Sequence, residues 1–139
     1  MSYHEEGTDL NHIFEKAAND GLGLSYDDFV LMPNFINFHY NEVDTRKWIA
    51  GDHLDIPIIS SPMDTVTGGE LALAMAENGA AGVIHRNMSA HQQAAEAAYL
   101  NEMGYRPWCA VSTREEDRKR IDDLISVGCG VLLIDSARS

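Results

Sequence analysis

Polar side chains follow four short apolar runs of this 139-residue chain, each at the point where a run ends. Most carry a hydroxyl, a carboxylate or a nitrogen donor, and one methionine lies among them. The groups are Ser60, Ser61, Met63 and Asp64; His85, Arg86 and Asn87; Ser112 and Thr113; and Asp135, Ser136 and Arg138. If the runs are parallel strands, their carboxyl ends share one edge of a sheet, so these groups gather there.

The types of these side chains favour nucleotide binding. A serine hydroxyl beside the first amides of a helix can hold a phosphate, because both donate hydrogen bonds to an anion. An acid at a strand end can accept from a ribose diol, and a methionine thioether can lie against a flat base. Structural roles stay open: Ser61 can cap its own turn, and Asp64 can accept from loop amides. For His85, a role in ordering its loop is favoured over acid or base chemistry.

No catalytic set accompanies these binding groups. No residue pair resembles a nucleophile with its base, and no cluster of histidines and cysteines has the spacing of a metal site. Cys109 lies inside an apolar run and Cys129 just before the next one. Both positions are away from the run ends, so both cysteines are predicted to be packing residues. The sequence therefore predicts no catalytic residue and no metal ligand on this chain.

The apolar runs recur at near-equal spacing and predict a repeated strand–helix unit. Their centres near residues 58, 83, 110 and 133 are separated by 25, 27 and 23 residues. After each of the first three runs, a hydroxyl residue precedes a glutamate or glutamine by three positions, the pattern of a capping box at a helix start. These patterns span Thr67–Glu70, Ser89–Gln92 and Thr113–Glu116 and predict helices over residues 68–78, 90–103 and 114–127.

The repeat predicts an α/β fold of the parallel (β/α)8 TIM-barrel type. About 250 residues in eight units give this spacing, and no Gly-x-Gly-x-x-Gly follows a strand, as it does in dinucleotide-binding open sheets. We expect residues 56–139 to supply only the N-terminal half of the barrel, about four strands and three helices. Residues 1–55 lack the repeat and would form a prelude that packs on the barrel, with a short amphipathic helix around residues 10–17 that ends at Gly21 and Gly23.

Composition disfavours several classes of function. Ten basic and 22 acidic residues give a net charge of −12, which argues against nucleic-acid binding because phosphate contacts need a basic face. No apolar run approaches the roughly 20 residues of a membrane span. Two cysteines and the lack of a signal peptide predict a cytoplasmic protein.

Five stretches resemble successive motifs of IMP dehydrogenase, in that family's order: residues 23–33, 56–67, 82–89, 113–117 and 131–136. The string from Ser60 to Val66 is the most specific of them. The sister family, GMP reductase, is similar around residues 63–66 but typically has an asparagine where Pro62 stands. The resemblance therefore favours the dehydrogenase.

This resemblance implies the NAD-dependent oxidation of IMP to XMP in guanine nucleotide biosynthesis. It assigns Ser61 to the phosphate of IMP and Met63 to the hypoxanthine base. It assigns Asp135 and Ser136 to the side of NAD that carries the nicotinamide ribose. It also implies a monovalent cation, potassium, whose site in the family lies in a part that this chain does not contain.

The chain departs from the family pattern in several ways. Only residues 104–107 join the second predicted helix to the third strand, so the paired regulatory CBS domains of most members are absent. The family's catalytic cysteine loop also comes after the fourth strand, so we expect this chain alone to be inactive. Ser139 stands where the family usually has a glycine.

Two other functions stay open, a non-catalytic nucleotide-binding or interaction remnant and a GMP reductase-like fragment. The expected partners are IMP and either a second copy, in a homo-oligomer, or a complementing C-terminal half.

Overall fold

The computed structural model describes residues 10–30, 33 and 35–136. The chain divides into two compact units, residues 1–40 and 41–139, and each is described by itself. The first contains α1 (Leu10–Asn19) and a short 3-10 turn, η1 (Tyr26–Asp28). Ala17 is buried on the apolar face of α1, and the ring of Phe14 lies 6.1 Å from that of Phe29. The helix ends before Gly21, whose φ of 68° is left-handed, so the predicted helix and its stop are confirmed.

A 3-10 turn, η2 (Tyr40–Glu42), spans the chain boundary between the units, and the second unit continues with a two-stranded antiparallel hairpin. Its strands are β1 (Lys47–Ile49) and β2 (Asp52–Leu54). Ala50 and Gly51 connect them, and both have positive φ, 50° and 82°. Two such residues form the type I′ turn, whose twist matches that of the flanking strands. Leu54 is buried and packs in a core cluster with residues of the main sheet, so it anchors the hairpin to this unit.

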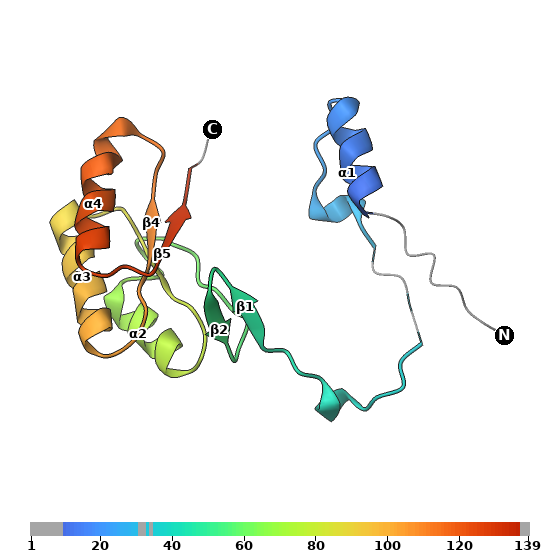
Figure 1. The fold of residues 1–139 in the computed structure, drawn as a ribbon, viewed down its shortest axis with the longest axis horizontal. Helices are drawn as coiled ribbons and strands as arrows, with labels where there is room; N and C mark the ends of the chain where they lie inside the picture. The colour runs from blue at the N-terminus through green and yellow to red at the C-terminus, as the bar shows by residue number, and fades with distance from the viewer. Residues whose placement is uncertain (1–9, 31–32, 34, 137–139) are drawn as a thin grey trace. The chain divides into compact units, whose positions relative to one another are not determined.

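Three parallel strands form the main sheet in the order β3 (Val83–Ile84), β4 (Trp108–Val111) and β5 (Val131–Ile134). Each is preceded by a helix: α2 (Gly69–Glu77), α3 (Ala90–Glu102) and α4 (Arg118–Ser126), the last opened by the 3-10 turn η3 (Glu115–Asp117). Figure 1 shows these helices along one face of the sheet. The parallel α/β fold predicted from the repeat is confirmed.

The first predicted strand is wrong in its extent. Within residues 56–59 only Ile59 pairs with the sheet, through an isolated parallel bridge to Ala81. Ser60 N donates to Ala81 O at 3.0 Å, and Ala81 N donates to Ile58 O at 3.1 Å. The direction is parallel, as predicted, but Ile58 N donates within the run, to Ile56 O at 2.7 Å, so its N–H does not continue the ladder. The described residues thus form a three-stranded sheet with a bridged edge rather than four full strands.

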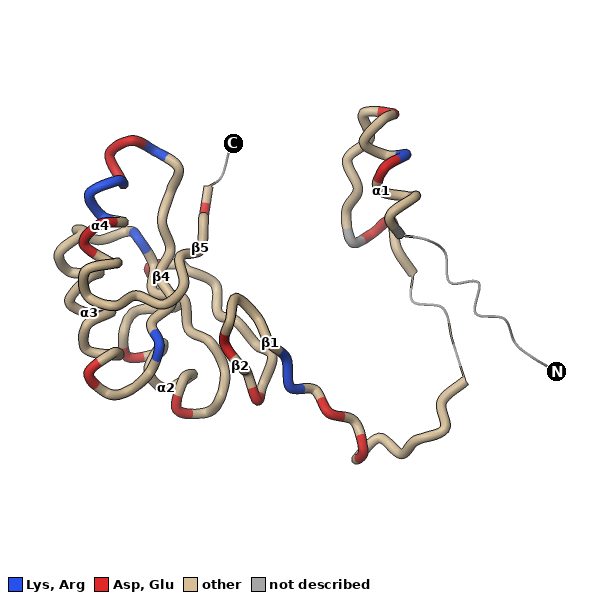
Figure 2. Tube along the Cα trace, in the orientation of Figure 1, with Lys and Arg blue, Asp and Glu red and all other residues tan. Residues whose placement is uncertain are grey.

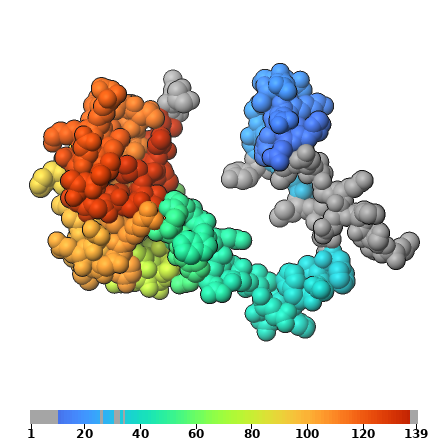
Figure 3. All heavy atoms as spheres, viewed as in Figure 1, coloured from blue at the N-terminus to red at the C-terminus, as the bar shows by residue number. Residues whose placement is uncertain are grey.

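Side chains of alternate residues along the strands enter two separate cores. Ile84, Cys109 and Val111 face the helices, where they pack with Leu100 and Leu124. The intervening residues face the other side and pack with the hairpin; these are Val83, Trp108 and Ala110, in contact with a cluster that includes Leu54. The space-filling view shows the helical side as a continuous surface of atoms (Figure 3). Both faces of β4 are therefore buried, as its unbroken apolar run requires.

One of the three predicted capping boxes forms. In α3, the Ser89 side chain accepts from the Gln92 backbone N–H, and the Gln92 side chain accepts from Ser89 N at 3.1 Å. The other two predictions are wrong. At α2 the N-cap is Gly68, which has no side chain, and at η3 it is Arg114, whose side chain makes no cap hydrogen bond. At α2 the predicted side chain, that of Thr67, makes tertiary hydrogen bonds instead of capping the helix. At η3 the predicted side chain, that of Thr113, is exposed.

Candidate functional site

The loop between Ile59 and α2 is organised by Thr67, which is fully buried. Its Oγ1 donates to Ser61 O at 2.8 Å and is hydrogen-bonded to the hydroxyl of Ser60 at 2.8 Å, so it does not cap the helix. Ser60 Oγ also accepts from Val83 N at 3.1 Å, and Thr67 O accepts from His85 N at 3.1 Å. These bonds fix both ends of the loop to β3, so the loop backbone is rigidly placed at the carboxyl end of that strand.

Ser61 and Met63 lie on the outer side of this loop. Both side chains are exposed, and that of Met63 is 54% exposed. The backbone beneath them is turned tightly: Met63 N donates to Ser61 O, and Met63 O accepts from the N–H groups of Val66 and Thr67, all at 2.9 Å. Two exposed side chains on a fixed turn suit contact with a ligand, because little backbone order remains to be gained on binding.

The end of β3 connects this loop to the next one. His85 is buried and its Nδ1 accepts from Asn87 N at 3.1 Å, which agrees with the loop-ordering role favoured from the sequence. The Asn87 side chain donates to Asp64 Oδ2 at 2.6 Å. The interpretation of Asp64 as an acceptor from loop amides is therefore wrong in its partner. Asp64 binds a side chain 23 residues away and joins the first two groups of the predicted site.

Arg86 joins the ends of β3 and β5. Its Nε donates to Asp135 O at 3.2 Å and lies 3.9 Å from Asp135 Oδ2. Asp135 is itself placed by its N–H, which donates to Val111 O at 2.8 Å. The Asp135 carboxylate is about half exposed, so it retains acceptor sites for a hydroxyl donor. Ser136, the next residue, is exposed, and Arg138 and Ser139 lie outside the described residues.

A buried polar network supports this edge from the helical side. Gln93 is fully buried in α3, and its Nε2 donates to Ile84 O at 3.2 Å and to Ala110 O at 2.9 Å. These carbonyls belong to β3 and β4, so one amide ties the two neighbouring strands to α3. Gln93 Oε1 in turn accepts from Arg120 Nη1 at 2.8 Å.

Arg120 and Asp117 complete the network. Arg120 Nε donates to Asp117 Oδ1 at 3.1 Å, and Nη2 donates to Met88 O at 2.9 Å. Asp117 Oδ2 accepts from Ser112 N at 2.8 Å and from Ser112 Oγ at 2.7 Å. Burial disfavours the charged carboxylate, but the hydrogen bonds from Ser112 and Arg120 outweigh it and hold the pKa of Asp117 below its usual value. Ser112 therefore belongs to the buried network and does not face the solvent, whereas Thr113 at the same strand end is exposed.

Sequence reasoning missed this network, although Gln93 offered a signal. It precedes Ala97 and Leu100 by four and seven positions, so it lies on the inward face of an amphipathic helix. A polar side chain on such a face needs buried partners. Arg120 gave no comparable signal, because it lies in the strongly charged run that opens α4. Figure 2 shows basic residues gathered at the start of this helix.

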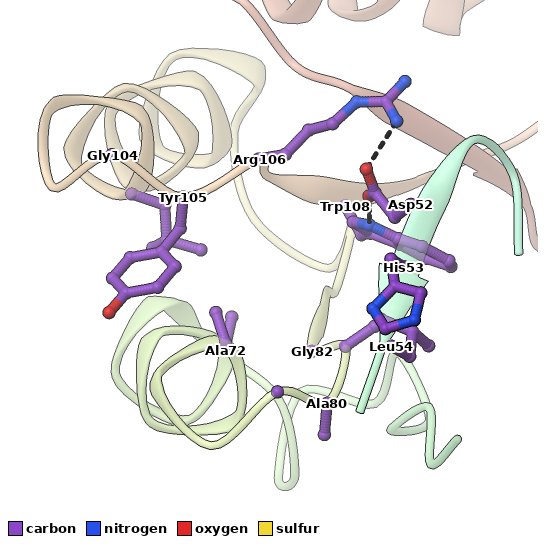
Figure 4. Close-up of a pocket in the computed structure, with 14 residues that line it drawn as sticks. Asp52, His53, Leu54, Ala72, Ala80, Gly82, Gly104, Tyr105, Arg106 and Trp108 are labelled. Carbon is purple, nitrogen blue, oxygen red and sulfur yellow. Dashed lines mark hydrogen bonds and ion pairs between the residues drawn. The ribbon is translucent and has the colours of Figure 1, made fainter. Parts of the chain in front are cut away.

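A concave region lies at the opposite, amino end of the sheet. This cavity of about 200 Å³ is lined by the hairpin, the ends of α2 and α3, and the start of β4 (Figure 4). Asp52 Oδ1 accepts from Arg106 Nη1 and Asp52 Oδ2 from Trp108 Nε1, both at 2.6 Å. Arg106 Nη2 donates to Gly130 O at 2.7 Å. The charged groups here bind one another, so this region holds the hairpin on the sheet.

Among the described residues, no three or more His, Cys, Asp or Glu side chains are grouped so as to hold a metal ion. In the same part of the chain, no helix has the length and apolarity needed to cross a membrane.

Comparison with known proteins identifies the family. Residues 23–139 match the family described as "IMP dehydrogenase / GMP reductase domain". The chain belongs to this family. The resemblance found in its motifs is thereby confirmed, and the matched residues include both the Ser60–Val66 loop and the strand end at Asp135.

Curated relatives carry the name inosine-5'-monophosphate dehydrogenase. The chain is 44% identical to that of Toxoplasma gondii over 92 residues, which is 66% of this chain and 16% of the relative. It is 47% identical to that of Bifidobacterium longum over 76 residues, 54% of this chain and 14% of the relative. For Trypanosoma brucei brucei the values are 40% over 90 residues, 64% and 17%. The chain thus spans about one-sixth of the length of the curated relatives that it matches.

Proposed function

We propose that this chain is the N-terminal part of an IMP dehydrogenase barrel and contributes the loop that holds IMP. The observation that carries the proposal is the Thr67-fixed turn, which presents Ser61 and Met63 at the carboxyl edge of the sheet. A hydroxyl at such an edge can donate to the phosphate of IMP. A half-exposed thioether two residues later can lie against the hypoxanthine ring.

In this proposal Asp135 and Ser136 bind NAD on its nicotinamide-ribose side. The residues present fit such a group, since the Asp135 carboxylate keeps exposed acceptor sites while Arg86 and the Val111 carbonyl hold its backbone. A carboxylate in this setting accepts hydrogen bonds from a ribose diol. NAD bound there would supply the acceptor for a hydride from the purine. The part of the chain described here provides binding and orientation for that step.

Turnover needs groups that the carboxyl edge of this chain does not present among its described residues. Oxidation of IMP requires a thiolate that attacks the purine and a base that activates water. Cys109 is fully buried inside β4, and a hydrogen bond to Cys129 together with burial raises its pKa, so it cannot serve as the nucleophile. We therefore propose that the isolated chain is inactive. Potassium, which the family implies, would bind outside the residues of this chain.

The proposed architecture is the first half of a TIM barrel, with residues 1–55 as a prelude and 56–139 as barrel strands and helices. Residues 103–107 join α3 directly to β4, which agrees with the lack of CBS domains between them. Both edges of the sheet expose isoleucines, Ile58 at 58% and Ile134 at 67%. A second copy or a complementing C-terminal half would cover these edges. Light scattering of the purified protein tests whether these edges are covered by another chain, and a stable monomer of 15.4 kDa would contradict it. We also propose that the protein is cytoplasmic.

Calorimetry with IMP tests the binding role of Ser61. The full chain is co-expressed with the C-terminal half of a relative such as the Bifidobacterium longum enzyme, and Ser61→Ala is compared with the unchanged chain. Loss of a hydrogen bond to a charged group costs about 1.5–3 kcal/mol, so IMP affinity should fall roughly ten- to a hundredfold.

The matched control is Ser126→Ala. Ser126 is exposed at the end of α4 and its hydroxyl donates to Asp123 O at 2.7 Å, so its loss should leave IMP affinity unchanged. Equal affinity of the Ser61→Ala complex and the unchanged complex would return Ser61 to a turn-capping role.

A non-catalytic nucleotide-binding role is the second candidate. It is favoured by one observation, namely that the described carboxyl edge carries hydroxyl, thioether and carboxylate groups but no thiol. If the co-expressed complex binds IMP without producing NADH, this second function is correct.

A further inference from the structure

Helix α2 begins without a side-chain cap of its own. Its N-cap is Gly68, and the side chain of Thr67 is hydrogen-bonded back into the loop. The first amides of a helix have no carbonyl partner within the helix, so they need an acceptor from elsewhere. At α2 the neighbouring helix supplies it, since Gly69 N donates to Glu96 Oε2 at 2.8 Å. A side chain of α3 therefore caps α2 across 27 positions of the sequence.

Glu96 lies close against the first turn of α2. A Cβ at Gly69 would lie 3.2 Å from Cβ and 3.3 Å from Cγ and Oε2 of Glu96, closer than an ordinary van der Waals contact. The glycine thus lets the glutamate side chain approach the helix backbone. The carboxylate also lies at the positive end of the helix dipole, where a negative charge is stabilising. Hydrogen bonding and charge therefore both favour this contact.

Helix α3 is itself fixed to the sheet next to this contact. Gln93, three residues before Glu96, is fully buried and donates to the carbonyls of Ile84 in β3 and Ala110 in β4. Side chains three apart on a helix are neighbours on its surface. One of them ties α3 to the two strands, and the other ties it to the start of α2. The first turn of α2 is thereby placed relative to the sheet.

We propose that Glu96 is a positioning residue that holds the loop of residues 60–67 in the conformation that binds IMP. The inference rests on the function proposed above for Ser61 and Met63. Thr67 is the residue directly before the N-cap of α2, and its hydroxyl donates to Ser61 O. Displacement of the first turn of α2 therefore displaces Thr67 and the turn that it fixes. Glu96 acts through this connection.

Nuclear magnetic resonance relaxation of the full chain tests the positioning role without a ligand. The amides of Val66 and Thr67 both donate to Met63 O. Their order parameters should lie near the rigid value of about 0.85 in the unchanged chain and fall clearly in Glu96→Ala, while those of β4 stay the same. A loss of overall stability does not lower order parameters of the folded chain. Unchanged values at Val66 and Thr67 would overturn the proposal.

The matched control is Glu102→Ala. Glu102 is the other glutamate of α3 and is exposed at the last residue of the helix, so its removal should leave the order parameters of the loop unchanged. Where Glu96→Ala gives no folded protein, Glu96→Asp answers the same question, because its carboxylate is shorter by one methylene and is withdrawn from Gly69 N.

Calorimetry of the co-expressed complex tests the consequence for IMP. The Kd for IMP should rise about fivefold in Glu96→Ala, the factor that corresponds to the loss of one helix cap, because the loop must then be ordered on binding. Glu96→Gln keeps an oxygen acceptor and should restore most of the affinity. A residue that only stabilises the fold would instead lower the number of binding sites at an unchanged Kd, and that result would overturn the proposal.

Comparison with Ser61→Ala separates the two proposals. If Ser61→Ala weakens IMP binding and Glu96→Ala does not, the positioning role is wrong and the function proposed for the loop stands. If Ser61→Ala leaves the affinity unchanged, the proposed role of Ser61 is wrong. In that case the order parameters of Val66 and Thr67 still decide whether Glu96 holds the loop.

Discussion

The two ends of the main sheet use polar side chains in opposite ways. At the amino end, Asp52 binds Arg106 and Trp108 through both carboxylate oxygens, and Arg106 binds the backbone of Gly130. At the carboxyl end, Ser61 and Met63 are exposed on a fixed turn. The same sheet is thus closed at one end by internal bonds and presents side chains to solvent at the other.

This difference separates the polar side chains that hold the unit together from those that are left exposed. The groups that fix the carboxyl end, Thr67, Gln93 and Asp117, are buried one layer below the exposed groups. In parallel α/β units, residues at the amino ends of strands mostly serve stability and those at the carboxyl ends serve ligands. Substitutions in the supporting layer, at the amino end and at the exposed turn should therefore have different consequences.

The largest effect is expected for Arg120→Ala, in the supporting layer. Its side chain and that of Asp117 are 13% and 11% exposed, so its removal leaves a buried carboxylate and the Gln93 oxygen without their partner. Breaking a buried pair costs about 3–5 kcal/mol. Urea denaturation measures the loss. The control is Arg118→Ala, whose ion pair with Glu115 is highly exposed and should contribute nothing measurable. Similar midpoints for the two variants would remove the distinction between the layers.

A smaller effect is expected for Asp52→Ala, at the amino end. This variant loses the acceptor for the Arg106 guanidinium and the Trp108 indole, and hydrogen bonds to charged groups contribute about 1.5–3 kcal/mol. The unfolding free energy should fall by about this amount. In the co-expressed complex, IMP affinity should stay unchanged, because the exposed turn is at the other end. Reduced affinity in a complex that remains folded would show that the two ends are coupled.

The smallest effect is expected in the pH dependence of stability. The pKa of Asp117 is lowered on folding, so its contribution is present above the unfolded value of about 3.9 and is lost as the pH falls through the folded value. Urea midpoints of the unchanged chain should therefore decline below pH 4. In Asp117→Asn this part of the decline should disappear, because the side chain no longer titrates. An equal decline in both proteins would assign it to other carboxylates.

Part of the candidate site followed from the sequence. The predicted strand ends at His85 and Asp135 are confirmed, since β3 ends at Ile84 and β5 at Ile134. A strand buried on both faces ends where its run of apolar residues ends, and this point can be read from the sequence. The roles of single polar residues were less predictable. Thr67 was expected to cap α2, yet it bonds back to Ser60 and Ser61, and Asp64 reaches Asn87 on another loop. A hydroxyl or carboxylate group can bind many kinds of partner, so its actual partner depends on which groups lie near it in the folded chain.

The sequence by itself determined the features that depend on neighbours within a few residues. These are the helices, the parallel repeat, the capping box of Ser89 and Gln92, and the apolar runs of β4 and β5. Only the tertiary structure decided the bonds between distant segments. Asp52 meets Trp108 across 56 positions, and Gln93 meets Arg120 across 27. The physical reason is that local patterns fix backbone conformation, whereas a polar side chain is satisfied only after the strands and helices have packed.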